Sequence, residues 1–205
     1  MTRHLYDLVS ILTHYLRIDG NVVDVGSRVA PQQAHLNLRR VFVGTAKYVG
    51  IDEVEGPGVD VVSPFSSELS VVDSIGVVLC LDVLEHVAEP VELIHHLVRF
   101  RARYNAWLIV STHLNMQYHP EPGVYGDYWR FSGAGLMRLL NLASAGLVQM
   151  LVRPSWEVQE DVCAIIFPDD VRSRVPDLDS RLGIAIDAAG KSSGWGPFSD
   201  LGTRT

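Results

Sequence analysis

The fold of this chain is decided by the stretch NVVDVGS at residues 21–27, where an apolar run ends abruptly in a turn of small residues. Such a run is typical of a parallel strand buried on both faces, and Gly26 lets a ligand approach the backbone closely. A second run, KYVGI at residues 47–51, ends in Asp52 and Glu53. A carboxylate at a strand tip can accept hydrogen bonds from ribose hydroxyls, and the glycine turn opens beside a cofactor. The two stretches together predict a nucleotide-binding site at the tips of neighbouring parallel strands.

Composition places the chain among globular proteins and argues against several partners. Its 205 residues suffice for one domain with a substantial core, and 47% of them are hydrophobic. The net charge of −7 disfavours binding to a nucleic-acid backbone, which requires a basic surface. No run approaches the roughly 18 consecutive apolar residues of a membrane span, and residues 1–4 lead into an amphipathic pattern rather than a signal-peptide core. We therefore expect a cytoplasmic protein with no membrane or nucleic-acid partner, and the sequence leaves a homo-oligomer open. Cys80 and Cys163 lie in apolar runs and are expected to be free buried thiols.

Alternating strand and helix patterns predict an α/β protein with a mostly parallel sheet covered by helices on both faces. A helix is expected over residues 2–18, where apolar residues recur at helical spacing and Thr2 can cap the first turn. Pro31 suits a first helical position, so a crossover helix is expected over residues 32–43. The other expected elements are strands at residues 22–25, 47–51, 59–62, 75–81, 107–110, 146–152 and 162–167, and helices beginning at Pro90, Gly133 and Leu182. The last two strands are separated by a short connection, so we expect them to pair antiparallel.

Beyond Pro168 the pattern weakens, although Trp195 and Phe198 could anchor this part of the chain on the core. The predicted organisation is a single domain over residues 1–168, followed by a C-terminal extension over residues 169–205 that could dock on it.

Four motifs, taken in order, resemble those of class I S-adenosylmethionine-dependent methyltransferases. They are VDVGS at residues 23–27, YVGID at 48–52, LDVLEHV at 81–87, and GDYWRFS at 126–132 followed by Gly135 and Leu136. The last motif looks like that of a sub-group of small methyltransferases, and the similarity extends over residues 22–167. The resemblance implies a Rossmann-like, doubly wound fold with a seven-stranded, mostly parallel sheet and an antiparallel final hairpin. It also implies S-adenosylmethionine as the cofactor.

The resemblance assigns expected roles around that cofactor. The resemblance places Asp24, Gly26 and Ser27 at the methionine end, Asp52 at the ribose hydroxyls, Pro64 and Phe65 near the adenine, and Leu81 and Asp82 beside the reacting methyl group. Glu53, next to Asp52, and Arg28, next to Ser27, complete the ten expected cofactor-binding residues. Arg28 departs from the family, which usually has a second glycine at this position. Its side chain could point to solvent, reach the cofactor carboxylate or narrow the site.

Methyl transfer is an in-line displacement on a sulfonium carbon, for which the protein supplies orientation, exclusion of water and, for an oxygen nucleophile, a base. Imidazole titrates near neutral pH, so His86 and His119 are the candidate catalytic bases. His86 could instead hydrogen-bond backbone at the start of the next helix. His119 belongs to a long polar and aromatic segment at residues 111–132, and loops of this length tend to be functional.

The same segment supplies the candidate substrate-binding residues. Tyr128 and Trp129 could contact the sulfonium or an aromatic substrate through cation–π or stacking interactions, or they could serve packing alone. Arg130 could bind a carboxylate or phosphate of the substrate, or pair structurally with Asp127.

The histidines also raise the question of a metal. His95 and His96 are adjacent on a predicted helix and cannot both face one ion comfortably. His113 and His119 lack a cysteine or carboxylate pattern of standard spacing, so we expect no metal site.

The function expected from these patterns is S-adenosylmethionine-dependent methyl transfer to a small-molecule acceptor, such as the hydroxyl of a sugar or other metabolite. One alternative is a non-catalytic cofactor-binding or scaffold protein of the same fold, and Arg28 in the glycine turn is the feature that favours it. A second alternative is a nicotinamide-dependent oxidoreductase. The missing Gly-x-Gly-x-x-Gly motif and the expected antiparallel hairpin both argue against that class.

Overall fold

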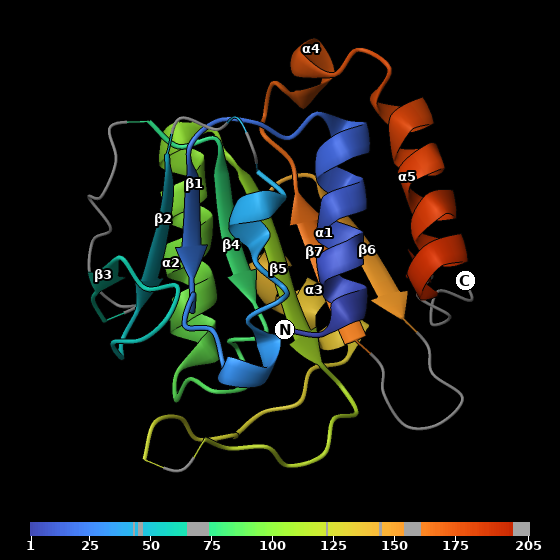
Figure 1. The fold of residues 1–205 in the computed structure, drawn as a ribbon. Coiled ribbons are helices and arrows are strands. Elements are labelled where there is room, and N and C mark those ends of the chain that lie inside the picture. The colour runs from blue at the N-terminus through green and yellow to red at the C-terminus, as the bar shows by residue number, and fades with distance from the viewer. Residues whose placement is uncertain are drawn as a thin grey trace.

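The computed structural model describes residues 1–42, 44, 47–64, 74–121, 123–143, 145–153 and 161–198. Its centre is one eight-stranded sheet with the strand order β3-β2-β1-β4-β5-β7-β6-β8 (Figure 1). The strands are β1 Val22–Val25, β2 Tyr48–Asp52, β3 Val61–Val62, β4 Val77–Leu81, β5 Trp107–His113, β6 Val148–Arg153, β7 Asp161–Ile166 and β8 Gly196–Pro197.

The sheet is parallel on one side and antiparallel on the other. The pairs from β3 to β5 are all parallel, whereas β7 is antiparallel to both β5 and β6. This confirms the α/β, Rossmann-like sheet and its antiparallel final hairpin. The sheet has eight strands rather than the expected seven, because Gly196 and Pro197 pair with the outer edge of β6. Two residues are too few to show a strand periodicity, so the sequence gives no signal for β8.

Helices cover the two faces of the sheet as separate layers (Figure 1). The helices are α1 Arg3–Leu16, α2 Pro90–Tyr104, α3 Gly133–Leu142, α4 Val171–Arg174 and α5 Leu178–Ser193. One layer contains α1 and α5, and the other contains α2 and α3. The expected N-terminal helix forms because its leucines share one face and Thr2 Oγ1 accepts a hydrogen bond from the Leu5 amide. Arg17 adopts a left-handed conformation and ends this helix.

The crossover helix expected over residues 32–43 is wrong. In the described part of this segment the chain makes only two short 3₁₀ turns, Pro31–Gln33 and Leu38–Arg40. Asn37 separates them, because its side-chain oxygen accepts a hydrogen bond from the Arg39 amide and starts a new turn there. Such local side-chain bonds compete with a continuous helix.

The C-terminal segment packs on the same core as the rest of the chain. Helix α5 lies along α1, and Trp195 is buried beyond its end. Cys80 and Cys163 are buried free thiols, as expected. Within the described ranges, no helix is both long and apolar enough to cross a membrane.

The carboxyl ends of the parallel strands form one edge of the sheet, and the long loop and the N-terminus also lie there (Figure 1). The parallel strands β1, β2, β4 and β5 all end at this edge, and residues 114–121 and 123–132 cross it as an extended loop (Figure 1). The N-terminus reaches the same edge. Ligands of open α/β sheets bind outside the carboxyl ends of the strands, so this edge is where a site is expected.

Candidate functional site

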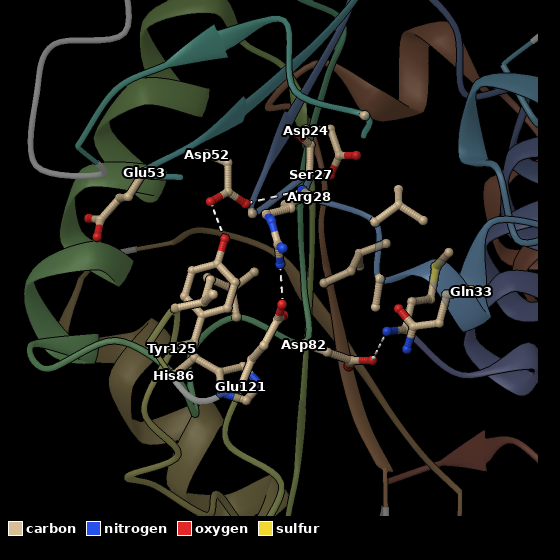
Figure 2. Close-up of a pocket in the computed structure, with 18 of the residues that line it drawn as sticks. Asp24, Ser27, Arg28, Gln33, Asp52, Glu53, Asp82, His86, Glu121 and Tyr125 are labelled. Atoms are coloured by element: carbon tan, nitrogen blue, oxygen red, sulfur yellow. Dashed lines mark hydrogen bonds and ion pairs between the residues drawn. The ribbon is translucent and has the colours of Figure 1, made fainter. Parts of the chain in front are cut away.

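A cavity of about 1180 Å³ lies at the carboxyl ends of β1, β2 and β4 (Figure 2). Eight of the ten predicted cofactor-binding residues line it: Asp24, Gly26, Ser27, Arg28, Asp52, Glu53, Leu81 and Asp82. Pro64 is exposed and does not line the cavity, and Phe65 lies outside the described residues. The predicted residues at the ends of three different strands therefore line the same cavity.

Strand β1 carries a buried carboxylate into this cavity. Asp24 accepts a hydrogen bond of 2.7 Å from the Tyr48 hydroxyl on the neighbouring strand. Burial raises the pKa of Asp24 to about 6, although the Tyr48 hydrogen bond opposes the rise. Two residues further on, Gly26 turns the chain at φ +78°, and Ser27 Oγ is buried with no hydrogen-bond partner among the described residues.

Strand β2 ends in Asp52, whose carboxylate is almost fully buried. Its two oxygens accept hydrogen bonds from the amides of Arg28 and Val54, both at 3.0 Å. One of them also accepts a short hydrogen bond from the Tyr125 hydroxyl (Figure 2). Asp52 therefore ties the glycine turn after β1 to the long loop.

Arg28 is neither solvent-facing nor unpaired. Its Nη1 lies 2.7 Å from Glu121 Oε2, and its guanidinium lies 5.9 Å from the centre of the Tyr125 ring (Figure 2). Glu121 and Tyr125 belong to the long loop, where the backbones of the two residues pair as an isolated antiparallel β-bridge. The loop is thus held over the cavity by contacts to the ends of β1 and β2.

A buried cluster of charged groups lies where β4 and β5 end. Asp82 and Glu85 follow β4, and His113 is the last residue of β5. His113 Nε2 lies 3.6 Å from Asp82 Oδ2 and 3.4 Å from Glu85 Oε1. Its Nδ1 lies 2.7 Å from Asp161 Oδ1 at the start of β7. The amino group of Met1 also lies 3.5 Å from Asp82 Oδ2.

The pKa values in this cluster depend on each other. Burial raises the pKa of Glu85 to about 7, and the charge of Asp82 adds to the rise. Burial alone would lower the pKa of His113, but the charge of Asp82 and the hydrogen bond with Asp161 raise it to about 9. For Asp82 the effect of burial has the opposite sign and would raise the pKa. The charges of His113 and of the amino terminus outweigh it and hold the pKa of Asp82 below its usual value. One imidazole thus faces three carboxylates. Asp82 also has a positive φ of 56°, in the left-handed region that few non-glycine residues adopt but that aspartate tolerates better than most.

The two predicted bases lie beside this cluster and line the cavity. The rings of His86 and His119 have centroids 5.0 Å apart, and those of His119 and His113 are 5.9 Å apart. His86 Nδ1 lies 2.7 Å from the Gly126 carbonyl, so the backbone bond that was its structural alternative is present, although it reaches the long loop rather than the next helix.

The predicted substrate-binding residues separate into two groups. Tyr128 lines the cavity, whereas Trp129 and Arg130 do not. The Trp129 indole N–H donates to the Val87 carbonyl. Arg130 donates to both oxygens of Asp127, as its structural alternative required, and this pairing holds the pKa of Asp127 far below its usual value.

The sequence did not identify several residues that form part of the site. They are Tyr48, Glu85, His113, Glu121, Tyr125 and Asp161. A signal for Glu85 and His113 existed, because His113 ends β5 and Glu85 follows the adjacent parallel strand β4, at the carboxyl ends where ligands bind. Asp161 lies on an antiparallel strand and carries no such signal.

Comparisons with known proteins define the fold. No protein-family model matches the chain, and no curated protein does. Among solved structures, the N-terminal domain of EvdMO1 with SAH bound is 15% identical, with a TM-score of 0.56 over 82% of each chain. The same domain in the presence of SAH and D-fucose is 18% identical, with a TM-score of 0.53 over 80% of this chain and 82% of that one.

The structure of EvdMO1 itself is 20% identical, with a TM-score of 0.56 over 95% of this chain and 52% of that chain. The present chain thus spans about half the length of that protein. At these identities the likeness shows the fold alone, which is a Rossmann-like α/β fold.

Proposed function

We propose that the protein is an S-adenosylmethionine-dependent methyltransferase that modifies a hydroxyl group of a small molecule, such as a sugar or other metabolite. The observation that carries the proposal is the convergence of the glycine turn at Gly26 and the carboxylate of Asp52 on one cavity. SAH, the product of S-adenosylmethionine, is bound in a solved structure of the same fold. The antiparallel pairing of β6 and β7 favours this class over a nicotinamide-dependent oxidoreductase.

In the proposed complex, the turn after β1 holds the methionine end of the cofactor and Asp52 accepts hydrogen bonds from the ribose hydroxyls. Leu81 and Asp82 form the wall beside the sulfonium. The buried carboxylates at this wall suit a cationic sulfur, because opposite charges attract strongly where water is excluded.

The acceptor oxygen attacks the methyl carbon, the carbon–sulfur bond breaks, and the hydroxyl proton passes to a base. His86 and His119 support this last role because both line the cavity. The Nδ1 of His86 faces a carbonyl, which can only accept a hydrogen bond, so Nε2 of the neutral ring is left to take a proton.

Calorimetric titration with S-adenosylmethionine and SAH tests the proposal. We expect both to bind, and we expect the variant Asp52→Ala to weaken binding about 100-fold, because two hydrogen bonds to a charged acceptor are worth about 1.5 kcal/mol or more each. The control is Asp187→Ala, which removes an exposed carboxylate of α5. Failure of both ligands to bind the wild-type protein, or equal affinities for the two variants, would contradict the proposal. A methylation assay with a panel of hydroxylated acceptors then separates an enzyme from a non-catalytic binding protein.

The observation that favours a non-catalytic protein is the position of Tyr125, whose hydroxyl already donates to Asp52. If the proposal holds, this hydroxyl competes with the ribose and must move when the cofactor enters. The variant Tyr125→Phe keeps the ring and removes the competing bond, so we expect the affinity for SAH to rise about tenfold. The matched control is Tyr128→Phe, which changes another tyrosine of the cavity lining that has no bond to Asp52 among the described contacts. A weaker affinity in Tyr125→Phe would show that the hydroxyl helps to bind the cofactor rather than competing with it.

A further inference from the structure

The cluster behind the cavity has two buried carboxylate oxygens that are held in place but not satisfied. Asp82 Oδ1 accepts a hydrogen bond of 2.6 Å from the Ser111 hydroxyl, and Glu85 Oε2 accepts one of 2.9 Å from the Thr112 hydroxyl. Each carboxylate is thereby fixed in orientation by a donor on β5. The other oxygens, Asp82 Oδ2 and Glu85 Oε1, are buried and accept no hydrogen bond from any described residue. A buried carboxylate oxygen without a hydrogen-bond donor is costly, so a cation between these two oxygens would stabilise them. The nearest positive groups are the Met1 amino group, 3.5 Å from Asp82 Oδ2, and the His113 ring, whose Nε2 lies 3.6 Å from Asp82 Oδ2 and 3.4 Å from Glu85 Oε1.

The neighbouring imidazoles have the complementary arrangement. Each directs its Nδ1 at an oxygen that accepts hydrogen bonds: His113 at Asp161 Oδ1 (2.7 Å), His86 at the Gly126 carbonyl (2.7 Å) and His119 at the Gln117 carbonyl (2.8 Å). A carbonyl or an ionised carboxylate cannot donate, so the ring proton belongs on Nδ1. In the neutral rings Nε2 therefore carries a lone pair, which is the state that binds metal ions.

These lone pairs and free oxygens meet at distances that a metal ion would span. His113 Nε2 lies 3.4 Å from Glu85 Oε1 and 3.6 Å from Asp82 Oδ2, and His86 Nε2 lies 4.0 Å from Glu85 Oε1. Ligand atoms about 2.1 Å from a tetrahedral ion are about 3.4 Å from each other. The ligand atoms of Asp82, Glu85 and His113 all fall within 4.8 Å of one another.

We propose that Asp82, Glu85 and His113 bind a divalent transition-metal ion, such as Zn²⁺ or Mn²⁺, with His86 as a further donor. With the ion bound, the Nε2 of His86 is occupied and His119 is the base that remains. Mixed imidazole and carboxylate ligands suit such ions. Asp161 positions the His113 ring through Nδ1, as carboxylates commonly do for metal-binding histidines. This inference is opposite to the sequence expectation of no metal site, which considered the histidines without the carboxylates that the fold brings to them.

The site also has a clear role, which rests on the proposed function. An ion at the end of β4 would lie beside the wall assigned to the reacting methyl group. Bound to the acceptor oxygen, it would lower the pKa of the hydroxyl and hold the oxygen for attack, with the proton passing to His119. The alternative to a metal ion is a protonated His113, whose Nε2–H would face Asp82 Oδ2 and Glu85 Oε1 and compensate their charge.

The test uses the full chain, stripped of metal with a chelator and titrated with Zn²⁺ and with Mn²⁺. We expect one ion per chain, and we expect Glu85→Gln and His113→Gln to weaken binding by at least about 100-fold. The orienting variant Asp161→Asn should weaken it about 10-fold to 100-fold. The matched control is His96→Ala, because His96 and Glu92 form a similar but more exposed pair at 3.8 Å on α2, which lines the cavity outside the cluster. The amino group of Met1 shares Asp82 Oδ2, so the variants are placed on Glu85 and His113 rather than on Asp82.

Two further measurements keep the test decisive. If a variant does not fold, an X-ray absorption spectrum of the Zn²⁺-loaded wild-type protein must show imidazole among the ligands, and its absence would overturn the site. Binding that survives Glu85→Gln and His113→Gln, or that is lost only in His96→Ala, would do the same. Titration with SAH in the presence and absence of the ion separates the proposals, because metal binding without SAH binding would reject the proposed function and leave the site standing.

Discussion

Replacing Gly26 with alanine is expected to lower the free energy of unfolding by about 2–4 kcal/mol and to weaken SAH binding at least about tenfold. Gly26 has a φ of +78°, and a Cβ atom there would lie 2.2 Å from Val83 Cγ2. Alanine at this position therefore destabilises the protein in two ways. The left-handed backbone costs about 1–2 kcal/mol, and the added Cβ overlaps with a buried side chain. Relief of the overlap has to move the turn that lines the proposed cofactor site. Urea denaturation and calorimetric titration measure the two effects.

A second glycine separates these causes. Gly146 has a nearly equal φ of +81°, but the nearest atom to its added Cβ would be 3.9 Å away. Gly146→Ala should therefore show only the backbone cost and leave SAH binding unchanged. In the background of Val83→Ala, the change Gly26→Ala should destabilise the protein less than it does in the wild type. Equal destabilisation by Gly26→Ala and Gly146→Ala would show that the contact with Val83 does not constrain the turn.

The strands and the order of the motifs could be predicted because their signals are local. The runs ending at Gly26 and Asp52 are apolar along their whole length, and this is what burial on both faces of a parallel sheet requires. The final hairpin followed from two strand patterns with a short connection. The helix expected over residues 32–43 failed because the side chain of Asn37 makes a local bond that a helical pattern does not reveal.

The candidate site was predicted only in part, because its chemistry depends on contacts between distant residues. Asp82 and Glu85 are three residues apart, but His113 and Asp161 join them only through the pairing of β4, β5 and β7. The same holds for Tyr125, whose bond to Asp52 spans 73 positions in the chain. No periodicity records such contacts. The topological rule that adjacent parallel strands end at one edge could have placed His113 near Asp82.

Replacing Trp195 with alanine is expected to lower the free energy of unfolding by about 3–5 kcal/mol, the largest stability change that we predict. Trp195 lies beyond the end of α5, is 1% exposed and belongs to the core formed by α1, α5 and the sheet. Its indole N–H donates to the His4 carbonyl at 3.1 Å, so it joins the two ends of the chain. Truncation leaves a cavity beside α1 and removes this hydrogen bond. We therefore propose that residues 171–198 stabilise the fold as part of its core rather than as an optional extension. Urea denaturation followed by circular dichroism measures the change.

Trp129 provides the matched control, because it is also a tryptophan whose indole N–H donates to a backbone carbonyl, that of Val87. It is 43% exposed, so Trp129→Ala removes much less buried surface and should cost about 1 kcal/mol. Both variants lose one indole hydrogen bond, so the difference between their changes in the free energy of unfolding measures the contribution of the buried Trp195 side chain. Equal effects would mean that the C-terminal segment adds little to the core. A large effect of Trp195→Ala with unchanged SAH affinity would place the role of this segment in stability alone. The cavity lies at the ends of β1, β2 and β4, whereas β8 is the last strand at the far edge of the sheet.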